Sequence, residues 1–193
     1  MSKNKVLHII LSILAAIVLH IAVVHPILDL VTILSPLENV GAIFIESCMV
    51  YEVTKYFFQG WTRRDKILIT INYIITVLFI MFVRPKLGGA YFQLNPFALF
   101  RELYYGNYYQ WMIFFCNIVM FIPLPYILGH RILNKTALFL TCFMIGVLLE
   151  LLQTITHRGI FDLGDILLYS IGIIIGMIIR KHIFTKQQRV VYR

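Results

Sequence analysis

Charged side chains are scarce in this sequence: Asp, Glu, Lys and Arg together make up 13% of its 193 residues. A soluble globular domain carries about twice that share. Hydrophobic residues make up 60% of the chain, and the mean hydropathy is +0.85. A soluble fold of this length cannot bury so much apolar surface, because its surface is too large relative to its volume. The composition therefore excludes a soluble domain and predicts an integral membrane protein.

Cysteine is also scarce, and the three cysteines, Cys48, Cys116 and Cys142, each lie alone in an apolar stretch. There is no Cys-x-x-Cys pair and no Cys/His spacing typical of metal ligands, so neither a disulfide framework nor a metal site is predicted. The sequence also has no phosphate-binding glycine loop, zinc-protease helix or nucleophile elbow. It thus predicts no cofactor, and it leaves open whether the protein is an enzyme.

The formal net charge of +8 comes from basic residues that lie mainly between the apolar runs. This arrangement is typical of the positive-inside rule for membrane proteins. A nucleic-acid-binding protein would instead carry a basic stripe on a folded soluble face. The predicted partner is therefore the lipid bilayer, and no nucleic-acid partner is predicted.

Six apolar runs divide the chain, and a helix needs roughly 20 apolar residues to cross a bilayer. We predict an all-α fold, a polytopic membrane helical bundle of about six transmembrane helices, or five if residues 39–58 do not span. The expected organisation is an N-terminal membrane segment with two spans (1–66), a membrane domain (67–180) and a basic cytoplasmic tail (181–193). The runs cover residues 6–24, with an extension as far as 34, then 39–58, 67–83, 111–128, 136–154 and 165–179.

The doubtful run, 39–58, is apolar in bulk but contains Glu46 and Glu52. If it spans and the N-terminus is inside, 13 of the 17 basic residues lie on the cytoplasmic side. Only Arg84, Lys86, Arg101 and Arg158 then lie outside. This bias favours six spans with both termini cytoplasmic. Glu46 then lies near the middle of the membrane, where a carboxyl group needs a partner or a proton.

Three further polar residues, His20, His25 and Asp29, belong to the first run and its extension. His25 and Asp29 are four residues apart, so they share a helix face. A hydrogen bond near the helix end is one interpretation, and a proton relay or a metal pair is the other. No third metal ligand is evident in the sequence.

The densest group of polar residues runs from Glu150 to Asp165. Glu150 and Gln153 are three apart and share a helix face, and the cost of a charge near hydrocarbon predicts that this face points into the bundle. Arg158 is the nearest basic partner in sequence and could pair with Glu150 or Asp162. Asp165 opens the last span, where a carboxylate suits the positive end of the helix dipole. The group is either a functional site or a structural set of polar contacts that holds the last two spans together.

The fourth and the sixth apolar runs carry residues that suit contact between helices. Asn117 lies in an apolar run and is expected to form an interhelical hydrogen bond, from a position that could reach the outer polar group. Gly172 and Gly176 form a small-xxx-small pattern, which allows another helix to approach closely. Asp165, Tyr169 and these two glycines fall on one helical face.

The order of these motifs resembles the VanZ-like family over about residues 84–180. The resemblance rests on Gln93-Leu-Asn-Pro-Phe97, Asn117-Ile-Val-Met-Phe-Ile-Pro-Leu124, Glu150-Leu-Leu-Gln153, Arg158-Gly-Ile-Phe-Asp162 and the segment 165–172. The family usually has Asn where this chain has Tyr169, four residues after Asp165. The resemblance implies low-level resistance to teicoplanin-type glycopeptides, the property of the founding members, but it implies no particular reaction.

From this resemblance and the predicted topology, we expect a VanZ-like protein of the bacterial cell membrane that acts at the outer face. One alternative is a membrane enzyme that modifies a lipid-linked or cell-wall precursor, and another is a small transporter or scaffold. Arg158 could hold an anionic lipid headgroup or a peptide carboxylate. The expected functional cluster comprises Asn95, Arg101, Asn117, Glu150, Gln153, Arg158, Asp162 and Asp165.

Overall fold

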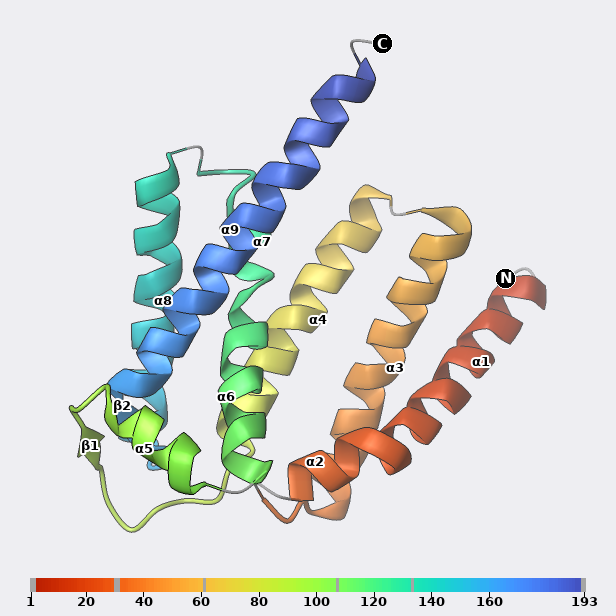
Figure 1. Cartoon of the computed structure of the whole chain (residues 1–193). Helices are drawn as coiled ribbons and strands as arrows, with labels where there is room; N and C mark the ends of the chain where they lie inside the picture. The colour runs from red at the N-terminus through yellow and green to blue at the C-terminus, as the bar shows by residue number, and fades with distance from the viewer. Residues whose placement is uncertain (1–2, 30–31, 61, 107, 133, 192–193) are drawn as a thin grey trace. The chain divides into compact units, whose positions relative to one another are not determined.

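A computed structural model describes residues 3–29, 32–60, 62–106, 108–132 and 134–191 of the chain (Figure 1). Within these ranges, every regular element is a helix except for two strands of two residues each. This confirms the predicted all-α fold. The chain divides into two compact units, Met1–Pro85 and Lys86–Arg193, which are described one at a time.

Five helical segments of the described chain are long and apolar enough to cross a membrane. They confirm a multi-pass membrane protein with a helical bundle. Each matches one of the apolar runs in the sequence, and they cover Val6–Asp29, Arg63–Phe82, Gln110–Leu128, Lys135–Ile155 and Leu163–His182.

The first unit begins with α1 (Lys3–Leu19), a π-helical turn η1 (His20–Val24) and α2 (His25–Asp29). The π turn ends two residues before Pro26, which has no N–H for the carbonyl of Ala22 and whose ring crowds that carbonyl. The helix widens there, and the N–H of His25 donates to the carbonyl of His20, five residues back. The first span is therefore one helical rod with a local widening at His20.

The unit continues with α3 (Pro36–Gln59) and α4 (Arg63–Phe82), and α3 packs against both α1 and α4. Both helices begin with a capping box, Ser35 with Glu38 in α3 and Thr62 with Asp65 in α4. Each box satisfies backbone N–H groups that the first turn leaves without a helical partner. Lys55 also donates to Asp65, which ties the end of α3 to the start of α4.

Helix α3 corresponds to the doubtful run 39–58. Its 24 residues extend for about 36 Å, which is enough to cross a bilayer. It is not one of the five candidate spans, and it contains Glu38, Glu46, Glu52 and Lys55. That α3 crosses the membrane stays a prediction.

The second unit contains β1 (Phe92–Gln93), α5 (Ala98–Tyr105), α6 (Tyr108–Phe121), α7 (Leu124–Leu128), α8 (Lys135–Ile155), β2 (Phe161–Asp162) and α9 (Leu163–Val191). Helix α9 packs against α6, α7 and α8 and is the centre of this unit. Helix α6 ends at Phe121, and Pro123 and Pro125 follow, neither of which can donate a helical hydrogen bond. Helix α9 extends beyond the predicted span and includes most of the predicted basic tail; its side chains from residue 183 onward, and Tyr192 and Arg193 entirely, lie outside the described residues.

Gly172 and Gly176 lie where α9 touches α6. A methyl group added at Gly172 would overlap the carbonyl oxygen of Ile118, and one added at Gly176 would overlap that of Ile122. The backbones of the two helices are therefore in direct contact over one turn, which only glycine allows here.

A short parallel ladder joins two segments that lie far apart in the sequence. Phe92 pairs with Phe161 and Gln93 with Asp162, and the N–H of Phe161 donates to the carbonyl of Tyr91 at 3.0 Å. Neither strand was predicted from the sequence, and neither was α5. The ladder brings the segment before α5 to the turn that connects α8 with α9.

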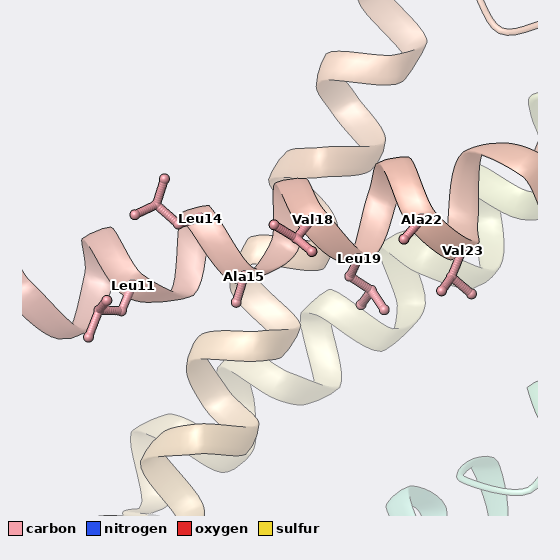
Figure 2. A pocket seen from close by; sticks show the side chains of 7 residues that line it. All are labelled: Leu11, Leu14, Ala15, Val18, Leu19, Ala22 and Val23. Atoms are coloured by element: carbon pink, nitrogen blue, oxygen red, sulfur yellow. The ribbon is translucent and has the colours of Figure 1, made fainter.

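One side of α1 and η1 is entirely apolar and exposed. Figure 2 shows the seven side chains that line a shallow hollow there: Leu11, Leu14, Ala15, Val18, Leu19, Ala22 and Val23. In a membrane protein such a face suits contact with lipid tails. None of these seven side chains carries a polar group, so this face has no group for acid–base or nucleophilic chemistry.

Candidate functional site

Among the acidic side chains that the structure describes in the second unit, Glu150 is the most deeply buried, with 1% of its surface exposed. It lies in the last two turns of α8, facing α9. The hydroxyl of Tyr169 donates to its Oε2 at 2.7 Å, and the backbone N–H of Asp162 approaches its Oε1 at 3.4 Å. These donors stabilise a carboxyl group that would otherwise be costly at this depth.

The ring of Tyr169 is fixed by two neighbours on other helices. Phe121 of α6 stacks on it, with the ring centroids 4.2 Å apart and the planes 23° from parallel. On the α8 side, a methyl group added at Gly146 would lie only 3.2 Å from the tyrosine ring. Gly146 therefore leaves the space that lets Tyr169 reach Glu150, one turn further along α8.

The C-terminal end of α8 positions Arg158. The N–H of Arg158 donates to the carbonyl of Gln153, and the N–H of His157 donates to that of Thr154, which is the Schellman pattern. His157 has φ of 57°, a left-handed conformation that normally favours glycine. Gly159 follows, and a Cβ atom there would lie 3.2 Å from the side chain of buried Gln153. The turn is thus packed tightly against α8.

Asp162 ends β2 and caps α9. Its Oδ1 accepts a hydrogen bond from the N–H of Gly164 at 2.6 Å, and the N–H of Asp165 also bonds to this carboxylate. Burial raises the pKa of Asp162, while these two hydrogen bonds oppose the shift. Asp162 therefore fills the capping position, and Asp165 lies in the first turn of α9.

Asp165 binds Asn117 across the contact between α9 and α6. The amide Nδ2 of Asn117 donates to Asp165 Oδ1 at 2.6 Å, and Asn117 is buried whereas Asp165 is half-buried. Because the amide is held in an apolar helix, it gives the carboxylate a fixed orientation. This bond closes the α6 side of the cluster.

The structure brings six of the eight predicted residues to one end of the second unit: Asn117, Glu150, Gln153, Arg158, Asp162 and Asp165. The other two, Asn95 and Arg101, have exposed side chains on the adjoining segment. Asn95 Oδ1 accepts from the N–H of Phe97 at 3.0 Å in the turn that leads into α5. Sequence reasoning missed Tyr169 as the donor to Glu150, since nothing in the sequence shows which faces of α8 and α9 meet.

The cluster combines three carboxyl groups with one guanidinium. Both carboxyl oxygens of Glu150, and the Oδ1 atoms of Asp162 and Asp165, accept hydrogen bonds from other groups of the protein. The side chains of Arg158 and Asp165 are half-buried. A guanidinium in this setting suits a carboxylate or phosphate ligand. Among the described residues, no group of three or more His, Cys, Asp or Glu side chains is placed to hold a metal ion.

These features define an all-α, multi-pass membrane protein with a buried polar cluster at the junction of its last helices. Residues 67–185 match the family described as VanZ/LLP1. The match covers more than half of the chain, so the chain belongs to the VanZ/LLP1 family, which confirms the resemblance found in the sequence. No curated protein and no solved structure is significantly similar to the chain.

The variant Tyr169→Phe is expected to be less stable by about 1–3 kcal/mol, because it removes a hydrogen bond to a buried carboxyl group but keeps the ring stack on Phe121. The free energy of unfolding of the purified chain in detergent micelles would measure this loss. Tyr104→Phe is the matched control, since the Tyr104 side chain is exposed. Equal stability of the two variants would contradict the assigned bond.

Proposed function

We propose that this protein acts at the outer face of a bacterial cell membrane and lowers sensitivity to teicoplanin-type glycopeptides. The observation that carries the proposal is the convergence of Asn117, Glu150, Asp162 and Asp165 at one end of the second unit, beside Arg158. Under the positive-inside rule this end faces outward and both termini are cytoplasmic. Glycopeptides act on that side of the membrane, which supports the assignment.

In this proposal Arg158 binds an anionic group, either a lipid headgroup or the carboxylate of a lipid-linked cell-wall precursor. Glu150 and Asp162 hold the turn that carries Arg158, through the bond between Glu150 and the N–H of Asp162. Glu150, Gln153, Arg158 and Asp165 form the core of the site, and Asn95 and Asn117 support it. Arg101 lies on α5, at the edge of the proposed site.

The test is the tolerance of a susceptible bacterial strain that expresses the chain. The wild type is expected to raise the minimum inhibitory concentration of teicoplanin above that of the strain with an empty vector. Arg158→Ala should abolish the increase, and Glu150→Gln should reduce it, with each variant present in the membrane at the wild-type level. Arg131→Ala, which changes an exposed arginine on the predicted inner side, is the matched control. Full tolerance in both site variants would refute the proposal.

The outer-face assignment has its own measurement in the same strain. In a chain whose three native cysteines are replaced by alanine, a cysteine at the exposed position Tyr104 should react with a membrane-impermeant maleimide in intact cells. A cysteine at Arg131 should react only after the cells are opened. The reverse pattern would place the cluster on the cytoplasmic side.

A second candidate is a membrane enzyme that modifies a lipid-linked precursor. The observation in its favour is a group of exposed aromatic side chains on α5 and the start of α6, namely Phe100, Tyr104, Tyr105, Tyr108 and Trp111. Tyr and Trp prefer the membrane–water interface, so this segment suits the level of lipid headgroups. A change in the lipid or precursor profile on deletion of the gene would favour the enzyme, and an unchanged profile would argue against it.

A further inference from the structure

The first unit contains a buried polar seam that the proposed function does not use. On α1 and η1, His8, Ser12, Ala16 and His20 follow one another at four-residue spacing, and the last three are at most 3% exposed. This face packs against α3. It lies on a different side of the helix from the apolar face in Figure 2.

At the η1 end of the seam, His20 contacts two side chains of α3. Its Nδ1 lies 2.9 Å from Oε1 of Glu46, and its Nε2 lies 3.1 Å from Oδ1 of Asn39. The side chains of His20 and Glu46 are 3% and 12% exposed, so water does not compete effectively for these bonds. The second carboxyl oxygen of Glu46, Oε2, is buried and has no hydrogen-bond partner among the described residues.

The orientation of the Asn39 amide determines the proton on Nε2. Asn39 Nδ2 lies 3.3 Å from the carbonyl oxygens of both Leu34 and Ser35, which can only accept hydrogen bonds. The NH₂ group must therefore face these carbonyls, and Oδ1 must face His20. Because Oδ1 is an acceptor, His20 Nε2 must carry a hydrogen.

The bond between His20 and Glu46 then requires one more proton. If Nδ1 carried no hydrogen and Glu46 were ionised, two lone pairs would face each other at 2.9 Å in a buried site. Either the carboxyl group is neutral and donates to Nδ1, or the imidazole is doubly protonated and donates to the carboxylate. Both forms contain the same number of protons, one more than neutral histidine with ionised glutamate.

We propose that His20, Glu46 and Asn39 form a proton-binding site inside the first unit, in which one proton is shared between His20 Nδ1 and Glu46 Oε1. The regular four-residue spacing that runs from His8 to His20 supports this site, because it places His20 on the face of the helix that packs against α3. The proton makes the pair electrically neutral overall, which suits a group buried within a candidate membrane span.

On α3, the carboxylate of Glu38 accepts a hydrogen bond from the N–H of Ser35, and the buried carboxyl group of Glu52 lies six residues beyond Glu46. On α2, the ring of His25 lies 5.6 Å from that of His20 and is paired with Asp29 at 2.7 Å, where both side chains are more than 40% exposed. On α1, His8 binds Thr54, two turns beyond Glu46 on α3. On α4, Asp65 binds Lys55 at the far end of α3. The proton therefore belongs to the His20–Glu46 pair.

The proposal predicts how stability depends on pH. Above about pH 6.5 an unfolded chain has neutral histidine and ionised glutamate. The folded pair then holds one proton more than the unfolded chain, so stability should fall as the pH rises. Between about pH 4.3 and 6.5 the unfolded histidine is charged, the two states bind equal numbers of protons, and this contribution should be flat.

Glu46→Gln is the decisive variant. The amide of glutamine can donate permanently to Nδ1, so the seam should keep its hydrogen bonds without the shared proton. Thermal unfolding of the full chain in lipid nanodiscs is expected to show that Glu46→Gln releases one proton fewer than the wild type on unfolding above about pH 6.5. Asp29→Asn, which alters the exposed histidine–carboxylate pair, should release the same number as the wild type.

If Glu46→Gln keeps the wild-type pH dependence, the site is wrongly assigned. A measurement on the wild type covers the case in which the variant does not fold. Nitrogen-15 NMR of histidine-labelled chain in lipid, with His20 identified by its contact to the Glu46 carboxyl carbon, should show a hydrogen on Nε2 at neutral pH. A hydrogen on Nδ1 alone, with Nε2 bare, would overturn the proposal.

Discussion

The chain with Gly172→Val is expected to lose about 3 kcal/mol of stability, because the new side chain has no space between α9 and α6. Even a single methyl group at this position would overlap the carbonyl oxygen of Ile118. The overlapping atom belongs to the backbone, so no rotamer change can relieve the clash and the helices must separate. Separation would also break the bond between Asn117 and Asp165, which spans the same contact. The free energy of unfolding of the purified chain in detergent micelles would measure the loss.

Gly88→Val provides the control for this substitution. A methyl group at Gly88 meets no atom within 4 Å, so the same chemical change should alter the free energy of unfolding very little. The loss of stability in Gly172→Ala should lie between those of Gly172→Val and Gly88→Val, since alanine adds the clashing atom without the rest of the valine side chain. A Gly172→Val chain as stable as Gly88→Val would mean that α6 and α9 are not in backbone contact.

Asn117→Asp is expected to destabilise the chain by about 2–4 kcal/mol at neutral pH, because it places a second carboxylate where an amide now donates to Asp165. Two carboxylates this close cannot both be ionised, so one of them must take up a proton on folding. The loss should therefore shrink as the pH is lowered, when one carboxyl group is protonated and can act as the donor. Unfolding at a series of pH values would show both effects.

The double variant Asn117→Asp with Asp165→Asn separates this electrostatic cause from simple damage to packing. It restores one amide and one carboxylate with their positions exchanged, so most of the stability should return. A residual loss of about 0.3–1 kcal/mol is expected, because the carboxylate has left the first turn of α9. Equal stability of the single and double variants would show that the contact does not depend on this pair.

The sequence was sufficient to predict the helical membrane fold. A run of about 20 apolar residues is long enough to cross a bilayer, and inside the bilayer a helix satisfies all of its own backbone hydrogen bonds. It also indicated which polar residues were unusual. Asn117 and Glu150 stand out inside apolar runs. A polar side chain there costs the least free energy when it faces the interior of the bundle, and both side chains are buried in the structure.

The partners of these residues could not be predicted, because they depend on the rotation of each helix about its axis. Tyr169 reaches Glu150 from 19 residues away only because Gly146 leaves space for its ring. His20 meets Glu46 only because α1 turns its Ser12–Ala16–His20 face towards α3. Strands of two residues, such as β1 and β2, are too short to show an alternating pattern.

The pairing of β1 with β2 limits how the second unit can be inserted during synthesis. The chain between the strands contains two candidate spans, Gln110–Leu128 and Lys135–Ile155. If only one of them crossed, roughly 30 Å of hydrocarbon would separate the strands and no ladder could form. The ladder thus requires an even number of crossings between its strands. Because β2 follows both spans in the chain, it can pair with β1 only once both spans have been inserted.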